Sequence, residues 1–203
     1  MRVFFLLTVL LVAGCAVSSK HDSTHRAPVV IPTDDHGRAV GCSWYCGAPP
    51  ITVTASKTLR DGIFSYEPAN VHDWKKDTVW AVGDAQHGIG TKLRFTFDCT
   101  GRSYQRDNPL GIHGFSLING FARNPRLWAS NSRAKALKIT FNGRDYGSVT
   151  VADTIEPQTV RLPKLTLVPG KKNHLVFELA DVYPGETRDT CIADIVFDGF
   201  GVH

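Results

Sequence analysis

The sequence lacks the long apolar run, the basic stripe and the catalytic signatures that mark several large protein classes. Beyond residue 15, no stretch is apolar enough to span a bilayer. The 23 Lys and Arg residues stand against 19 Asp and Glu, and they form no stripe interleaved with aromatic side chains, so nucleic acid is not an expected partner. Neither a G-x-S-x-G nucleophile elbow nor an H-E-x-x-H zinc motif is present. These absences argue against an enzyme.

The amino-terminal 15 residues have the composition of an export signal. Arg2 precedes an apolar run over residues 3–12, which is too short to span a bilayer and fits a signal-peptide core. The run ends in LVAGC, which resembles the bacterial lipoprotein box, whose cysteine, here Cys15, is acylated and becomes the first mature residue. The alternative is ordinary cleavage after Cys15, with the small residue Ala13 nearby. Because Ala16 follows rather than Asp, the resemblance implies a lipid-anchored protein of the bacterial cell envelope, at the outer membrane.

Composition divides the chain into three parts. Residues 1–15 are the expected lipoprotein signal peptide. Residues 16–41 are rich in Ser, His, Asp, Thr and Pro, which predicts a disordered tether between lipid and domain. Residues 42–203 remain, and about 160 residues are enough for one domain with its own core.

The domain is predicted to be all-β. Alternating or apolar runs of strand length lie at 51–55, 92–99, 114–121, 136–141, 146–151, 159–162, 175–179 and 191–197. Asn142-Gly143 is a strong signal for a tight hairpin between two of them. No helix-period stretch exceeds two turns. Many short strands separated by turn residues favour a sandwich or a barrel.

Four cysteines remain after Cys15, and an even number in an exported chain indicates disulfides. Three pairings are possible. Cys42 and Cys46 are close in sequence. Cys99 and Cys191 each fall on the alternate positions of a predicted strand that face the core. We therefore favour the pairs Cys42–Cys46 and Cys99–Cys191. A four-cysteine zinc site is the competing interpretation, although only one of the pairs has the close spacing of such sites.

Six motifs in a fixed order resemble one known family: CSWYCGAPP, TASKTL, SYEPANVHDWKKDTVW, GIGTKLRFTF, LINGFARNPRLWASNSRAKALKITFNG and VYPGETRDTCIADIVFDGFG. Together they are similar to the discoidin-like (coagulation factor type C) domain that precedes the catalytic part of bacterial NAD glycohydrolases. The resemblance covers nearly all of 42–200. It implies a jelly-roll β-sandwich of about eight strands, and a carbohydrate-binding-like module without catalysis of its own. No stretch matches the NAD glycohydrolase catalytic domain, so we expect no enzyme activity.

The segment NVHDWKKDTVW corresponds to a loop that holds calcium in many discoidin-like domains. By this resemblance, Asp73, Thr78 and Asp194 match ligand positions. Two positions depart from the pattern, because Trp74 replaces a glycine and Lys75 replaces an acid, which puts a cation where calcium needs anionic oxygens. The alternative is an Asx-turn, in which the Asp73 side chain accepts hydrogen bonds from nearby backbone amides. Apart from this structural calcium, no cofactor is expected.

Aromatic residues beside turns are the candidates for ligand contact. By the resemblance, Trp74 stands where the family has a small turn residue, so it is expected to be exposed. There it would stack on a sugar ring or on a partner's side chain. The alternative is that its ring covers the core. Trp128 and Tyr183 are further candidates. Arg133 is expected to pair with an acid near the sheet edge.

Three functions follow from this reading. The favoured one is a non-catalytic, membrane-anchored module that binds carbohydrate or another envelope component through loops at one end of the sandwich. The second is a structural or assembly lipoprotein that contacts another envelope protein. The third is an enzyme such as an NAD glycohydrolase, against which the missing catalytic motifs argue.

Overall fold

The computed structural model describes residues 27–31, 44–101 and 109–201. Within these ranges the chain forms one short helix, α1 (Pro125–Ser130), and two 3₁₀ turns, η1 (Trp44–Cys46) and η2 (Pro68–His72). The twelve strands are β1 (Val29–Ile31), β2 (Ile51–Ala55), β3 (Arg60–Asp61), β4 (Phe64–Ser65), β5 (Trp80–Gly83), β6 (Lys92–Asp98), β7 (Gly111–Asn119), β8 (Ser132–Phe141), β9 (Arg144–Thr150), β10 (Gln158–Thr166), β11 (Lys172–Tyr183) and β12 (Asp189–Phe200). No helix in the described part of the chain could cross a membrane.

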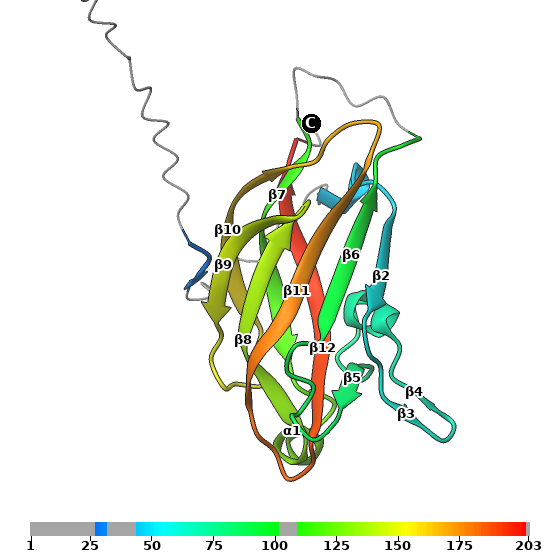
Figure 1. The fold of residues 1–203 in the computed structure, drawn as a ribbon, viewed down its shortest axis with the longest axis vertical. Helices are drawn as coiled ribbons and strands as arrows, with labels where there is room; N and C mark the ends of the chain where they lie inside the picture. Colours follow the sequence, from blue (N-terminus) through cyan, green and yellow to red (C-terminus); the bar gives the residue numbers. More distant parts are fainter. Residues whose placement is uncertain (1–26, 32–43, 102–108, 202–203) are drawn as a thin grey trace, which may run out of the picture.

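Ten strands form one hydrogen-bonded sheet that folds over into two layers (Figure 1). The order along the sheet is β1-β10-β7-β12-β8-β11-β6-β2, while β5 joins β12 and β9 joins β8. β12 connects the layers, since it pairs antiparallel with β7 along most of its length and parallel with β8 at Thr190 and Cys191. The front layer in Figure 1 contains β9, β8, β11, β6 and β2. The all-β sandwich is confirmed, with more strands than the eight expected.

Side chains of β6 alternate between the core and the outer face of the front layer. Leu93, Phe95 and Phe97 are buried between the layers, whereas Lys92 and Arg94 are exposed on the outer face. Aromatic rings interlock in this core with edge contacts at centroid distances of 4.9, 5.2 and 5.7 Å, made by Phe95, Phe97, Phe177 and Phe197. Burying each such side chain contributes roughly 1.5–3 kcal/mol. A well-packed core therefore holds the outward-facing residues of β6 in place.

The Asn142-Gly143 hairpin between β8 and β9 is confirmed. Both residues have positive φ angles, 49° and 82°, as a two-residue hairpin turn requires. The Asn142 side chain also ties the turn to β11, since its Oδ1 accepts from the backbone N–H of His174 at 2.8 Å and its Nδ2 donates to Asn173 at 2.9 Å. This turn fixes one end of the outer face of the front layer.

The predicted disordered tether is wrong for residues 29–31. Val29–Ile31 form strand β1, which pairs antiparallel with β10 and places Val30 opposite Val160. Three consecutive β-branched residues suit a strand, and β1 satisfies backbone groups on the edge of β10. The signal peptide with Cys15, and the remainder of the tether, lie outside the described residues.

The predicted Cys99–Cys191 disulfide is wrong. Cys99 donates its backbone N–H to Lys171, just before β11, whereas Cys191 lies opposite Arg133, which pairs with Tyr183 at the far end of β11. The length of β11 therefore separates the two cysteines, on the order of 35 Å. A disulfide needs Cα atoms within about 7 Å. The alternation of apolar residues along the strands correctly predicted that both thiols are buried. It does not show at which end of a strand each thiol lies.

The separation of Cys99 and Cys191 also removes the four-cysteine zinc site, because these two thiols cannot share one metal ion. Cys191 is a free, buried thiol. Cys42 lies outside the described residues, so the Cys42–Cys46 pair stays a prediction.

Candidate functional site

The structure brings Trp128 and Tyr183 together around one buried arginine. The Arg133 guanidinium lies 4.6 Å from the Trp128 ring centroid and donates to both carboxylate oxygens of Asp153, at 3.0 and 2.8 Å. This confirms the expected pairing of Arg133 with an acid. The polar atoms of both aromatic side chains donate to backbone oxygens 3.0 Å away, those of Asn119 and Val151. The cluster thus uses its own hydrogen-bonding groups to hold the fold.

Trp74 lies apart from that cluster, on the loop between η2 and β5. Its side chain is 59% exposed, as expected, and its ring meets Tyr45 edge-on with centroids 4.8 Å apart. Its φ of 65° is in the left-handed region, which costs a residue with a side chain roughly 1–2 kcal/mol. A positive φ favours glycine, the residue that the resemblance implies at this position, and Trp74 adopts the same backbone geometry.

The three predicted calcium ligands converge beside this loop. Asp73 forms the expected Asx-turn, because its Oδ1 accepts from the Lys75 amide at 3.0 Å, and its Oδ2 accepts from the Thr78 hydroxyl at 2.8 Å. Asp194 on β12 is only 5% exposed, and its Oδ1 has no hydrogen-bond partner among the residues described. Burial, and then the negative charge of Asp73, raise the pKa of Asp194 to about 7 although two backbone amides donate to it.

The donor set at this loop contains two carboxylates. No group of three or more His, Cys, Asp and Glu side chains that could hold a metal is found within residues 27–31, 44–101 and 109–201. Both Asp73 oxygens already accept internal hydrogen bonds. The unpartnered Oδ1 of Asp194, in contrast, is stabilised only by a proton or a cation. The site therefore fits a calcium ion in part, through Asp194, Asp73 and the Thr78 oxygen.

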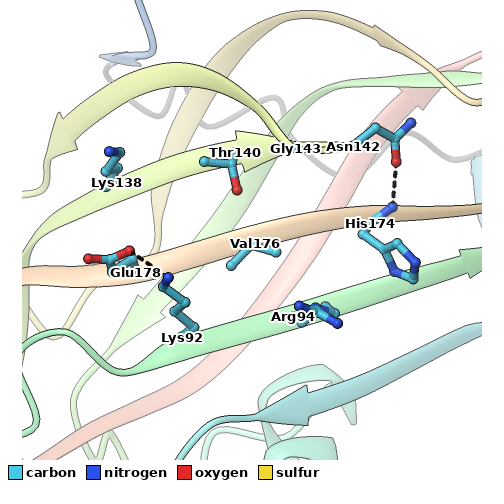
Figure 2. Close-up of a pocket in the computed structure, with 9 residues that line it drawn as sticks. All are labelled: Lys92, Arg94, Lys138, Thr140, Asn142, Gly143, His174, Val176 and Glu178. Atoms are coloured by element: carbon cyan, nitrogen blue, oxygen red, sulfur yellow. Dashed lines mark hydrogen bonds and ion pairs between the residues drawn. The ribbon is translucent and has the colours of Figure 1, made fainter.

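Sequence reasoning missed a groove on the outer face of the front layer, across β6, β11 and β8 (Figure 2). We call it the sheet groove. Its volume is about 360 Å³, within the range of roughly 300–1,000 Å³ that small-ligand sites occupy. It is lined by Lys92, Arg94, Lys138, Thr140, Asn142, Gly143, His174, Val176 and Glu178.

Strand register arranges the lining in three rows, which Figure 2 shows from left to right. In the first row, Glu178 lies between Lys92 and Lys138. In the second row, Val176 lies between Arg94 and Thr140. The third row places the His174 side chain beside the Asn142 turn, with the ring Nδ1 3.0 Å from the Thr96 hydroxyl. No hydrogen bond within the described part of the chain uses Nε2 of His174, so this ring nitrogen is left for a ligand.

The first row neutralises most of its own charge. Lys92 Nζ lies 3.5 Å from Glu178 Oε2, and Lys138 Nζ lies 3.1 Å from the Asp145 carboxylate. Arg94 differs, because its register neighbours on β11 and β2 are Val176 and Thr54, which carry no charge. Among the described residues, Arg94 has no ion pair and no hydrogen bond from its side chain. The groove therefore holds one positive charge that no described residue neutralises.

Comparison with known proteins gives the family. The chain matches the model of the NAD glycohydrolase translocation F5/8 type C domain over residues 44–198. The chain belongs to this family. No curated protein sequence matches it.

One solved structure shows the fold of this F5/8 type C domain, and two others are similar to it. CpGH89CBM32-5 from Clostridium perfringens, in complex with GalNAc-β-1,3-galactose, has a TM-score of 0.50 and 15% identity, over 73% of this chain and 94% of that one. The F5/8 type C domain of a Bacteroides fragilis protein has a TM-score of 0.49 and 16% identity, over 72% of this chain and 89% of that one. The CBM32 of AlyQ, in complex with 4,5-unsaturated mannuronic acid, has a TM-score of 0.47 and 14% identity, over 74% of this chain and 96% of that one. The first of these confirms the discoidin-like jelly-roll sandwich.

Proposed function

We propose that this F5/8 type C domain is a non-catalytic binding module that recognises carbohydrate through the sheet groove. The observation that carries the proposal is an open, polar groove. In it, Arg94 has no counterion among the described residues, and the His174 ring and the Thr140 hydroxyl line the same surface. A module of the same fold from Clostridium perfringens is solved with a disaccharide, which supports carbohydrate as the class of ligand. The groove, rather than the loops around Trp128 and Tyr183, is the proposed contact surface, because that cluster's hydrogen bonds are internal.

A glycan array followed by isothermal titration tests the proposal. Val176 forms the apolar floor of the groove, so Val176→Trp fills the space while suiting a strand. We expect this variant to lose binding. Thr166→Trp, on an exposed position of β10 in the other layer, is the matched control and should bind as the parent does. Absence of binding to every neutral and acidic glycan and envelope polymer would contradict the proposal.

A second candidate function is contact with another envelope protein. The β3–β4 hairpin projects from the sandwich (Figure 1), and its tip exposes two large apolar side chains, Ile63 at 95% and Phe64 at 64%. Such side chains occur singly on many surfaces, but two at the tip of one hairpin favour a binding contact. Capture of one defined envelope protein that is lost in the double variant Ile63→Ser, Phe64→Ser supports this function. Unchanged capture by that variant argues against it.

We propose further that the module is anchored in the bacterial envelope by acylation of Cys15. The LVAGC motif supports this. Metabolic labelling with a radioactive fatty acid should mark the parent and not Cys15→Ser, and the variant should leave the membrane fraction. Labelling of both proteins would rule out Cys15 as the acylated residue.

We also propose that a calcium ion stabilises the loop at Asp73, Thr78 and Asp194. The two adjacent carboxylates and the unpartnered Asp194 Oδ1 support a cation there. Calcium should raise the melting temperature of the parent, and Asp194→Asn should abolish that increase. A melting temperature that does not respond to calcium or to a chelator would exclude the ion.

A further inference from the structure

We infer that the sheet groove selects acidic polysaccharides, whose sugar rings carry carboxylate or sulfate groups, and that Arg94 binds the anion. The inference rests on the proposed function of the groove and adds the chemical class of its ligand.

The charge of the groove favours an anionic ligand. Its lining contains three basic side chains, Lys92, Arg94 and Lys138, and one acidic side chain, Glu178. Glu178 pairs with Lys92, and Lys138 pairs with Asp145. The surplus positive charge therefore lies in the middle row, at Arg94, and a carboxylate or sulfate on a bound sugar would neutralise it.

Arg94 also has the right geometry for an anion. A guanidinium presents its donors as a planar fork that matches the paired oxygens of a carboxylate or sulfate. Arg133, by comparison, uses this fork internally on Asp153. At Arg94 the fork lies in an open groove, with Thr54 and Val176 as its strand neighbours. The same chemistry is thus directed outward, toward solvent and a ligand.

Neutral groups around Arg94 suit the hydroxyls of a sugar. Thr140 lies across Val176 from Arg94, two strands away, so these polar groups span roughly 10 Å. Nε2 of His174 adds a further donor or acceptor in the third row. A shallow groove of this width accommodates a segment of a polymer lying across the strands. No Phe, Tyr or Trp side chain is among the described residues that line it, so nucleic-acid bases have no such surface on which to stack.

Affinity electrophoresis and titration with four polymers test the inference: polygalacturonate, dextran sulfate, neutral dextran and neutral galactan. We expect the two acidic polymers, or one of them, to bind and the neutral ones to bind at least about tenfold more weakly, since a charge-assisted hydrogen bond contributes on that order. Which acidic polymer binds better distinguishes carboxylate from sulfate as the preferred anion. Binding should weaken as salt is raised, because charges near a surface are screened.

Variants of the arginine complete the test. Arg94→Ala should weaken binding of the acidic polymer by at least about tenfold, for the same reason. Arg94→Lys keeps the positive charge without the planar fork, so its affinity for the acidic polymer should lie between those of the parent and Arg94→Ala. The matched control is Arg161→Ala, an exposed strand arginine on β10 in the other layer, which should bind normally.

Two results separate the inference from the proposed function. Binding of neutral and acidic polymers with equal affinity, blocked by Val176→Trp and unaffected by Arg94→Ala, would overturn the inference and leave the groove as a carbohydrate site. Failure of all four polymers, together with a negative glycan array, would overturn both.

Discussion

Replacing Asp194 by asparagine should remove a pH dependence that is built into the fold. Asp194 lies on β12, almost fully buried, with one oxygen unpartnered and the carboxylate of Asp73 nearby. Its pKa is raised to about 7 from an ordinary value of 3.8, mainly by burial. The folded protein therefore holds a proton on Asp194 at pH values where the unfolded chain has already released it.

The direction in which stability changes with pH follows from this difference in bound protons. Between about pH 4 and pH 7 the native state binds more protons than the unfolded state, so the free energy of unfolding falls as the pH rises. At about 1.4 kcal/mol for each pH unit, the loss is at most about 4 kcal/mol. This loss of unfolding free energy is absent below about pH 4 and complete above about pH 7. The amide of the Asp194→Asn variant cannot ionise, so this position should contribute no change in stability across the range.

Urea denaturation from about pH 3.5 to about pH 8, with a chelator present, measures the effect. We expect Asp194→Asn and the parent to be similar in stability at the acid end, and the variant to be more stable by up to about 4 kcal/mol at the alkaline end. Asp77→Asn, an exposed acid on the same loop, is the control and should follow the parent. Parallel pH profiles for the parent and Asp194→Asn would refute the argument.

Three further predictions concern the fold. Gly143→Ala should lower the free energy of unfolding by about 1 kcal/mol, because φ is 82° and no neighbouring atom obstructs a methyl group; an unchanged urea midpoint would contradict a backbone origin. Asp153→Asn should cost about 3 kcal/mol, since it leaves the buried Arg133 charge without its partner, and a loss under about 1 kcal/mol would place the pair with ordinary surface ion pairs. Cys191 should resist alkylation in the folded protein, because burial raises its pKa to about 12, and should react once urea unfolds the chain; rapid labelling without urea would contradict its burial.

Local patterns in the sequence predicted local structure well. Residues 51–55 are strand β2 with the same bounds, and 92–99 becomes β6 one residue shorter, because alternation and turn residues are properties of one segment. The Asx-turn at Asp73 and the Asn142-Gly143 hairpin are equally local. β11 extends from Lys172 to Tyr183, well beyond the predicted 175–179, since pairing with β6 and β8 holds its polar ends in the sheet.

Features that depend on strand register could not be predicted. The sheet groove draws on residues near positions 92, 140 and 176, and only the pairing of β6, β11 and β8 brings them together. The Cys99–Cys191 error has the same origin, because inward orientation does not fix position along a strand. For Arg133 the type of partner was evident from the sequence, while its identity, Asp153, required the fold.

Mapping of amide chemical shifts by NMR during titration with polygalacturonate and dextran sulfate tests the account most directly. With the acidic polymer that binds, the largest changes should fall on the outward-facing residues of β6, β11 and β8, centred on Arg94, Val176 and Thr140. Changes confined to the loops around Trp74 or Trp128, with the three strands unaffected, would contradict binding in the sheet groove.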